Sequence, residues 1–359
     1  MEPLPEKVNV LVLHWLGEGP LERIRAVAPD RLNVVSAISD FVEELSREWP
    51  AELLQRYRLR LDMERKHTDA EREALVRDAH VIFMTQPFPK TLVQRAPNLR
   101  WAHFSFAGVS NLMNTPWWGA PIDVTSSRGY TSVRPIAENV IGATFMFARR
   151  LDWAVDETRA HRFDPTSHPG ARLVRDKTMA IVGLGGIGSE VAKLAKGVGM
   201  RVIATRGSAT QRQENVDGVD VVFPASQLHD MLAEADFVAV CAAWTPETEA
   251  MLDAAAFTAL KPGAYLMNVS RGEIIDEPAM VEALRDGRLA GAYLDVWKDD
   301  FGSPPSADLQ ALPNVIFTPH VAGRSDGATV LTVDLFCKNL DRFLKGEPLE
   351  NLVDWERGY

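Results

Sequence analysis

The segment Met179-Ala-Ile-Val-Gly183-Leu-Gly185-Gly186-Ile187-Gly188 decides the fold, because it runs a strand directly into a GxGxxG turn and then into a helix. Gly183 allows a tight turn, Gly185 lets the backbone approach a pyrophosphate, and Gly188 permits close packing of the helix on the strand. The helix N-terminus offers free N–H donors and the positive end of its dipole to phosphates. The residues that this pattern assigns to a dinucleotide site are Gly183, Gly185, Gly186, Ile187 and Gly188.

The strand that follows ends without the acidic residue of an NAD site. Such sites carry Asp or Glu about 20 residues after the turn, where it accepts a hydrogen bond from the ribose 2′-hydroxyl. Here Thr205 ends the expected strand, and Arg206 and Ser208 follow it. A guanidinium pairs well with a 2′-phosphate, so we predict that these three residues lie at the adenosine ribose and that NADPH is preferred. The alternative is an exposed arginine that stacks on the adenine, with NAD as cofactor.

The composition is that of an acidic globular chain. Of its 359 residues 39 are basic and 49 acidic, which gives a net charge of −10, and 46% are hydrophobic. This length predicts two domains of mixed architecture. An acidic chain repels a phosphate backbone, and no basic cluster compensates, so we expect no nucleic-acid partner. No apolar run approaches the roughly 18 to 20 residues of a spanning helix, so we expect no membrane association.

The first residues and the cysteines indicate the compartment. Glu2 and Glu6 precede a short apolar stretch, Val8–Trp15, whereas a secretory signal needs a basic start and a longer apolar segment. Cys241 and Cys337 lie far apart and form no CxxC pair, so we expect neither a disulfide framework nor a zinc site. No His/Asp cluster has the spacing of metal ligands. We therefore expect a cytoplasmic protein without a metal.

Short apolar runs alternate with helical patterns along most of the chain, which predicts parallel sheets covered by helices on both faces. The expected strands are Val8–Leu13, Val81–Thr85, Met179–Val182, Arg201–Thr205, Phe237–Val240, Ala264–Asn268, Ala292–Asp295 and Val315–Thr318. The expected helices are Glu64–Arg77, Ile187–Val198, Gln227–Ala235, Ala254–Leu260, Pro278–Asp286 and Ala328–Leu344. Asp276 and Pro278 signal a helix start, with a capping carboxylate and a proline in the first turn.

Motifs in a fixed order resemble those of the D-isomer-specific 2-hydroxyacid dehydrogenase family, which includes glyoxylate/hydroxypyruvate reductases. Besides the glycine turn, the matching segments are 245–248 (TPET), 260–272 (LKPGAYLMNVSRG), 291–297 (GAYLDVW), 318–323 (TPHVAG) and 346–354 (GEPLENLVD). The similarity extends over nearly the whole chain.

The resemblance implies an α/β fold of two doubly wound parallel-sheet domains, Rossmann- and flavodoxin-like, with a C-terminal helix that crosses back to the first domain. It implies a substrate-binding domain over residues 1–127, completed by 324–359. A dinucleotide-binding Rossmann domain is expected over 128–323. The apolar segment from 137 to 151 resembles the start of an arm that grips a second subunit, so we expect a homodimer.

Reduction of a 2-keto acid requires a cation that holds the carboxylate and an acid that protonates the carbonyl oxygen as hydride arrives. Arg271 follows an expected strand end, where active sites of open parallel sheets lie, and its planar fork suits a carboxylate. His320 follows Pro319 at another strand end, and imidazole titrates near neutrality. By resemblance, Arg271 binds and polarises the substrate and His320 donates the proton.

The sequence departs from the family at the partner of this histidine. An ungapped match places the pairing glutamate of the family at Asp300, and Phe301 stands where a proline is usual. Aspartate is one methylene shorter, so it reaches His320 only if its loop moves inward. The alternatives are that Asp299 takes the role, or that Lys298-Asp299-Asp300 is a solvated turn and the histidine is partnered differently or not at all.

Other positions follow from the resemblance alone. The loop around Ala107, Gly108 and Val109 resembles the one whose backbone N–H groups, with Arg271, hold the substrate carboxylate. The further cofactor contacts that the resemblance implies are Ala243, Thr248, Val269, Ser270, Asp295 and Gly323. His14, Trp15, His103 and Trp297 are candidates for narrowing or widening the substrate site.

These observations predict an oxidoreductase that reduces a small 2-keto acid of the glyoxylate or hydroxypyruvate type to the D-2-hydroxy acid with NAD(P)H, preferably NADPH. One alternative is a catalytically idle, dinucleotide-sensing protein similar to the corepressors that share this fold. Another is an NAD-dependent dehydrogenase of a bulkier D-2-hydroxy acid.

Overall fold

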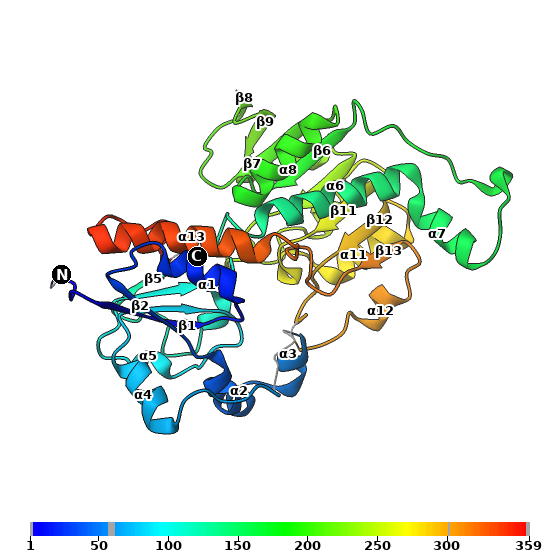
Figure 1. Cartoon of the computed structure of the whole chain (residues 1–359). Coiled ribbons are helices and arrows are strands. Elements are labelled where there is room, and N and C mark those ends of the chain that lie inside the picture. The colour runs from blue at the N-terminus through cyan, green and yellow to red at the C-terminus, as the bar shows by residue number, and fades with distance from the viewer. Residues whose placement is uncertain (1–2, 57–61, 301, 357–359) are drawn as a thin grey trace. The chain divides into compact units, whose positions relative to one another are not determined.

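The computed structural model describes residues 3–56, 62–300 and 302–356, and the chain divides into two compact units (Figure 1). Unit 1 consists of Met1–Ser132 and Ser325–Tyr359, and unit 2 of Val133–Arg324. The sequence places domain boundaries after residues 127 and 323, and these two boundaries remain predictions.

Unit 2 contains an eight-stranded sheet in the order β13-β12-β11-β10-β6-β7-β9-β8. Its strands are β6 (Thr178–Val182), β7 (Arg201–Arg206), β8 (Gln213–Val216), β9 (Val219–Pro224), β10 (Phe237–Val240), β11 (Ala264–Asn268), β12 (Leu289–Leu294) and β13 (Val315–Phe317). All neighbours are parallel except β8 and β9, an antiparallel pair that the sequence did not predict. The reason is local: Asp217 and Gly218, both with positive φ, form a two-residue turn that folds the chain into a hairpin.

The chain order of this sheet reverses beside β6. From β6 the chain adds β7 and β9 on one side, and then returns to add β10, β11, β12 and β13 on the other side. In open parallel sheets ligands bind outside the carboxyl ends of the strands at such a reversal. The loops that follow β6, β10, β11, β12 and β13 therefore share the edge where a site is expected.

Helices cover both faces of the unit 2 sheet. The helices of this unit are α6 (Val133–Arg149), α7 (Leu151–Arg159), α8 (Gly186–Gly197), α9 (Leu228–Leu232), α10 (Ala254–Ala259), α11 (Glu277–Arg285) and α12 (Ala307–Gln310). The helices expected in this unit are confirmed to within a few residues, and Asp276 caps α11 by accepting a hydrogen bond from Ala279 N.

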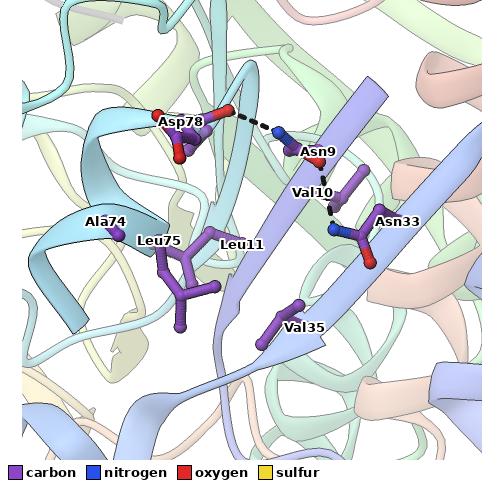
Figure 2. A pocket seen from close by; sticks show the side chains of 9 residues that line it. Asn9, Val10, Leu11, Asn33, Val35, Ala74, Leu75 and Asp78 are labelled. Atoms are coloured by element: carbon purple, nitrogen blue, oxygen red, sulfur yellow. Dashed lines mark hydrogen bonds between the residues drawn. The ribbon is translucent and has the colours of Figure 1, made fainter. Parts of the chain in front are cut away.

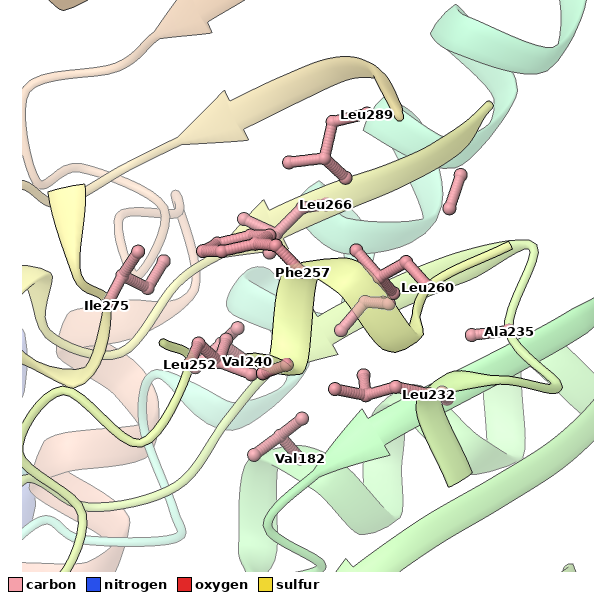
Figure 3. Close-up of a cluster of buried hydrophobic side chains, with 14 of the residues drawn as sticks. Val182, Leu232, Ala235, Val240, Leu252, Phe257, Leu260, Leu266, Ile275 and Leu289 are labelled. Carbon is pink, nitrogen blue, oxygen red and sulfur yellow. The ribbon is translucent and has the colours of Figure 1, made fainter. Parts of the chain in front are cut away.

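Alternate residues of each strand supply the two cores of unit 2. Figure 3 shows one of them, in which Phe257 and Leu260 from the α10 region pack against Leu266 of β11 and Val240 of β10. The opposite face of the sheet packs against α6 and α8. Because both faces are buried, the strands read as continuous apolar runs, which is why the sequence predicted them.

Unit 1 contains a five-stranded parallel sheet in the order β2-β1-β3-β4-β5. Its strands are β1 (Val8–Leu13), β2 (Leu32–Ser36), β3 (Val81–Met84), β4 (Trp101–Phe104) and β5 (Asp123–Ser126). Its helices are α1 (Glu18–Arg25), α2 (Val42–Glu48), α3 (Ala51–Arg56), α4 (Asp69–Arg77), α5 (Leu92–Arg95) and α13 (Ala328–Lys345). The C-terminal helix α13 belongs to this unit, where it packs beside α1 and Arg23 pairs with Asp334, so the expected return of the chain is confirmed (Figure 1).

Buried polar side chains explain why β4 and β5 were not predicted. Trp101 Nε1 donates to Thr125 Oγ1 at 2.9 Å, and His103 Nδ1 lies 2.8 Å from the same hydroxyl. His103 Nε2 lies 3.3 Å from Ser127 Oγ. These groups satisfy one another inside the core, although their residue types suggest exposure. His103 is fully buried, so its assignment to the lining of the substrate site is wrong.

The charged segment Glu64–Arg77 is helical over a shorter range than expected. The helix begins at Asp69, because Thr68 and Glu71 form a capping box that stops it there. Before the cap, His67 Nδ1 lies 2.7 Å from Asp40 Oδ2, and the backbone N–H groups of residues 66 and 67 donate to the same carboxylate. The segment is thus partly packed on unit 1 rather than wholly solvated.

A hollow of about 130 Å³ lies between β1, β2 and α4 (Figure 2). Asn9 Nδ2 donates to the carbonyl oxygen of Asp78, and Asn33 Nδ2 donates to Asn9 Oδ1. The asparagines lie near the amino-terminal ends of their strands, away from the edge where ligands bind to such sheets. In the described ranges, no helix is both long and apolar enough to cross a bilayer.

We expect unit 1 to lose stability in mild acid because of His103. Burial, with a smaller contribution from His14, lowers the pKa of His103 from 6.5 to about 3. Below pH 6.5 the unfolded chain therefore gains a proton that the folded unit does not, and unfolding becomes easier as the pH falls toward 3. At about pH 4.5 this group lowers the free energy of unfolding by at most about 3 kcal/mol.

Urea unfolding near neutral pH and in mild acid, followed by tryptophan fluorescence, measures this loss. His103→Gln should reduce the difference in unfolding free energy between the two pH values. The exposed His229 provides the control, and His229→Gln should keep the wild-type difference. The same pH dependence in His103→Gln and wild type would contradict the prediction.

Candidate functional site

The glycine turn after β6 leaves no room for side chains at two positions. Gly183 has φ +96°, and a Cβ there would lie 2.6 Å from Ala242 Cα in the loop after β10. A Cβ at Gly188 would lie 2.3 Å from the carbonyl oxygen of Gly183. The turn is therefore packed between its own helix and the neighbouring loop, which places α8 with its N-terminus at the carboxyl edge of the sheet.

The same turn is open on its other side. Gly185 is the N-cap of α8, no described side chain caps this end, and no described atom lies within 4 Å of a Cβ built there. The first intrahelical bond runs from Ser189 N to Gly185 O, which leaves the N–H groups of Gly186, Ile187 and Gly188 before it. Free donors at an open helix N-terminus fit a pyrophosphate.

The end of β7 is tied to this turn. Thr205 Oγ1 accepts a hydrogen bond from Gly183 N at 3.1 Å, and its carbonyl oxygen accepts one from Leu184 N at 2.9 Å. Thr205 is buried, so its hydroxyl serves the turn. Arg206 is the last residue of β7, its guanidinium pairs with Asp217, and Ser208 is exposed in the following loop.

The loop after β11 carries Arg271 and is held from within. Asn268 Oδ1 accepts from Ser270 N at 3.0 Å, and Asn268 Nδ2 donates to the carbonyl oxygen of Arg271 at 2.9 Å. Ser270 Oγ donates to the carbonyl oxygen of Ala242, the residue that also contacts Gly183. The loops after β6, β10 and β11 therefore meet at Ala242. Sequence reasoning missed Asn268, whose signal was a buried amide at the end of an apolar strand.

A backbone contact joins the Arg271 loop to the loop after β12. A Cβ at Gly272 would lie 2.1 Å from the carbonyl carbon of Trp297 and 2.2 Å from Lys298 N, so a residue with a side chain does not fit. This approach holds the segment around Asp300 beside the arginine in the fold of unit 2. Arg271 Nη1 donates to the carbonyl oxygen of Ser270 at 2.8 Å.

His320 and Asp300 are in direct contact. His320 Nδ1 lies 2.7 Å from Asp300 Oδ2, and the carboxylate side chain is almost fully buried while the imidazole is about one quarter exposed. Of the two neighbouring aspartates, Asp299 instead accepts a hydrogen bond from Ser303 Oγ at 2.9 Å. Its φ of +57° turns the chain so that the shorter Asp300 reaches the histidine. Phe301, which replaces the usual proline, lies outside the described residues.

Asp295 fixes the loop that carries His320. Its carboxylate accepts hydrogen bonds from Thr318 Oγ1 (2.5 Å), Val321 N (2.9 Å) and Ala322 N (3.1 Å), and its carbonyl oxygen accepts one from His320 N (2.8 Å). His320 has φ +54°, a left-handed conformation that a non-glycine residue adopts only under such constraint. Asp295, which the sequence predicted near the cofactor, thus organises the loop that carries His320.

The other cofactor contacts predicted in unit 2 differ in how far they are exposed to solvent. Thr248 Oγ1 donates to the carbonyl oxygen of Ala243 at 2.7 Å and closes the turn that contains both residues. Val269 is buried in the core, and Gly323 is partly exposed after the His320 loop. Among the described residues, no group of three or more His, Cys, Asp or Glu side chains could hold a metal ion.

The predicted substrate loop belongs to unit 1 and follows β4. Ala107 and Gly108 are partly exposed, whereas the Val109 side chain is buried in the unit 1 core. Its carbonyl oxygen accepts a hydrogen bond from Leu112 N at 2.9 Å. A ligand of this loop would therefore meet backbone groups at Val109 rather than its side chain.

Comparison with known proteins places this arrangement among dehydrogenases. Residues 141–322 match the family model of the D-isomer specific 2-hydroxyacid dehydrogenase, NAD binding domain. The chain is 32% identical over 289 residues to a glyoxylate reductase of Thermococcus litoralis. This match covers 77% of this chain and 83% of that protein.

Two solved structures resemble the whole chain. A D-isomer specific 2-hydroxyacid dehydrogenase family protein from Aeromonas salmonicida has a TM-score of 0.75 at 26% identity, over 97% of this chain and 99% of that one. The NADPH-dependent glyoxylate/hydroxypyruvate reductase from Sinorhizobium meliloti, in complex with NADP and sulfate, has a TM-score of 0.72 at 25% identity, over 98% of this chain and 100% of that one.

Proposed function

The chain belongs to the D-isomer-specific 2-hydroxyacid dehydrogenase family, and from this premise we propose that it reduces a small 2-keto acid, such as glyoxylate or hydroxypyruvate, to the D-2-hydroxy acid with NADPH preferred over NADH. It is an NAD(P)-dependent 2-hydroxyacid dehydrogenase. The observation that carries the proposed chemistry is the contact between His320 and Asp300 beside the loop of Arg271.

Each residue of this group has one proposed role. Arg271 binds the substrate carboxylate and draws electron density from the carbonyl through its guanidinium. A dinucleotide held at the glycine turn would supply the hydride for the carbonyl carbon. His320 donates a proton to the carbonyl oxygen, and this proton leaves from Nε2 because Nδ1 contacts Asp300. The Asp300 carboxylate contacts Nδ1 and thereby orients the ring so that Nε2 faces the substrate.

Two further sets of residues have proposed roles, one set in each unit. In unit 2 the cofactor is held at the glycine turn and by Thr205, Arg206, Ser208, Ala243, Thr248, Val269, Ser270, Asp295 and Gly323. In unit 1 the backbone N–H groups around Ala107, Gly108 and Val109 hold the substrate carboxylate.

Two observations support NADPH and a small substrate. Arg206 stands at the end of β7, where an NAD-specific site carries an acid. The similar Sinorhizobium meliloti reductase is NADPH-dependent and acts on glyoxylate and hydroxypyruvate, and the Thermococcus litoralis relative is a glyoxylate reductase.

A panel of 2-keto acids assayed with NADPH and with NADH tests the proposed activity. Glyoxylate or hydroxypyruvate with NADPH should give the highest kcat/KM. Arg271→Ala should lower that kcat/KM on the order of a hundredfold or more, because it removes a charged bidentate contact. Arg285 is exposed and paired with Asp308, so Arg285→Ala should leave the rate unchanged. Highest turnover of bulkier keto acids with NADH would instead establish the alternative substrate class.

The rate of the reduction tests the role of Asp300. Its carboxylate contacts His320 Nδ1 and so orients the imidazole for donation from Nε2. Asp300→Asn should therefore lower kcat on the order of tenfold or more. Asp299→Asn is the matched control, because its side chain contacts Ser303 and asparagine tolerates the positive φ. An unchanged kcat in Asp300→Asn would remove Asp300 from the mechanism.

We also propose that the enzyme is a homodimer that pairs through the α7 region. None of the described residues of α7 is buried. Large apolar side chains stand exposed on α7 and the following segment, namely Leu151, Val155, Phe163 and Leu173. Exposed apolar side chains gathered in one region are typical of an interaction surface, and a second copy of the chain is the commonest partner.

Light scattering after gel filtration checks the oligomeric state. The wild type should have twice the mass of the chain, and the double variant Leu151→Glu/Val155→Glu should have the mass of one chain, because burial of two carboxylates opposes pairing. Val330 is an equally exposed apolar residue on α13, so Val330→Glu serves as the control and should stay dimeric. A monomeric wild type would refute the proposal.

A further inference from the structure

The turn of the β8–β9 hairpin brings a carboxylate to the arginine at the end of β7. Asp217 and Gly218 form this turn with φ of 54° and 77°, and Val216 pairs with Val219 across it. The Asp217 carboxylate accepts a hydrogen bond from Nη2 of Arg206, which stands eleven positions earlier. Both side chains are partly exposed, Arg206 at 28% and Asp217 at 54%.

The other arginine of this loop is engaged elsewhere. Arg212 Nη2 donates to Glu234 Oε1 at 3.3 Å, and its guanidinium lies over the ring of Phe223 at 4.3 Å from the centroid. Arg206, by contrast, follows Thr205, which is hydrogen-bonded to the glycine turn. Arg206 is therefore the guanidinium best placed to meet the adenosine ribose of a dinucleotide bound at that turn.

A carboxylate and a 2′-phosphate compete for the same guanidinium. Both are planar or tripodal oxygen acceptors that arginine binds through charged hydrogen bonds. A 2′-phosphate must either displace Asp217 or share Arg206 with it. When both groups contact Arg206, the phosphate and the carboxylate lie close enough to repel each other. A 2′-hydroxyl carries no charge, so NAD binding neither displaces Asp217 nor places two negative groups side by side.

We propose that Asp217 competes with the 2′-phosphate for Arg206 and thereby lowers the preference of this enzyme for NADPH over NADH. The inference rests on the proposed dinucleotide-dependent function and adds a residue that limits cofactor selectivity. Asp217 acts through Arg206, so it is a positioning residue.

The turn geometry allows a substitution that removes only the charge. Asparagine tolerates the positive φ, and Asn-Gly is the preferred pair in such a hairpin turn, so Asp217→Asn retains the turn. Its amide oxygen can still accept from Arg206. Glu214→Gln removes one negative charge from an exposed position on the same hairpin and is the matched control.

Calorimetric titration with NADP⁺ and with NAD⁺, without substrate, measures the effect independently of turnover. Asp217→Asn should lower the Kd of NADP⁺ about tenfold, which corresponds to about 1.4 kcal/mol, and should leave the Kd of NAD⁺ within about twofold. Glu214→Gln should leave both values within about twofold. The effect should shrink at high salt, because both groups are partly exposed.

A double variant separates competition from a change in the hairpin. In an Arg206→Ala background, Asp217→Asn should no longer strengthen NADP⁺ binding, because no guanidinium is left to release. Unchanged or weaker NADP⁺ binding in Asp217→Asn alone would overturn the inference. If the wild type binds neither dinucleotide, the proposed function and this inference both fail. If NADP⁺ binds the wild type and Asp217→Asn with the same Kd, only this inference fails.

Discussion

The arrangement of the proposed catalytic loop depends on the hydrogen bonds that the Asp295 carboxylate accepts. It is buried, and it accepts from a side-chain hydroxyl and two backbone N–H groups of the segment Thr318–Ala322. A buried carboxylate without partners would be costly, so these donors and the acid hold one another in place. The left-handed conformation of His320 persists inside this frame, and the imidazole is thereby held against Asp300. Thr318 extends the network to Tyr293 and Asn139, whose amide donates to the carbonyl oxygen of Ala322.

Close contacts between backbone segments hold the other loops together at the carboxyl edge of the unit 2 sheet. Gly183 meets Ala242, Ser270 binds the same residue, and Gly272 lies against Trp297. Each contact joins loops that follow different parallel strands, so the glycine turn, the Arg271 loop and the Asp300 loop are positioned by one sheet. A site built on such a scaffold needs few dedicated side chains, since the carboxyl ends of the strands already converge. Two carboxylates also form contacts in unit 2, Asp300 with His320 and Asp217 with Arg206.

Unit 1 shows where interpretation by apolar runs breaks down. β1 and β3 were predicted because Val8–Leu13 and Val81–Met84 are apolar runs, interrupted only by Asn9. β4 and β5 were missed because His103 and Thr125 occupy core positions and bind each other there. The hairpin of β8 and β9 was missed for another reason, since β8 is a short edge strand with exposed polar residues. Its turn pair, Asp217-Gly218, was the local signal that could have revealed it.

The sequence by itself determined the strand–turn–helix unit around Gly183, most strands and helices of unit 2, and the residue types of the proposed chemistry. These features depend on local periodicity, capping and glycine spacing, which a linear sequence records directly. Tertiary structure alone decided that Asp300 rather than Asp299 contacts His320, that Asp295 holds the loop of His320, and that Asp217 returns to Arg206. Each of these is a contact between residues from different turns of the chain. Such contacts depend on how a loop bends by a few ångströms, and no local pattern of residue types encodes that bend.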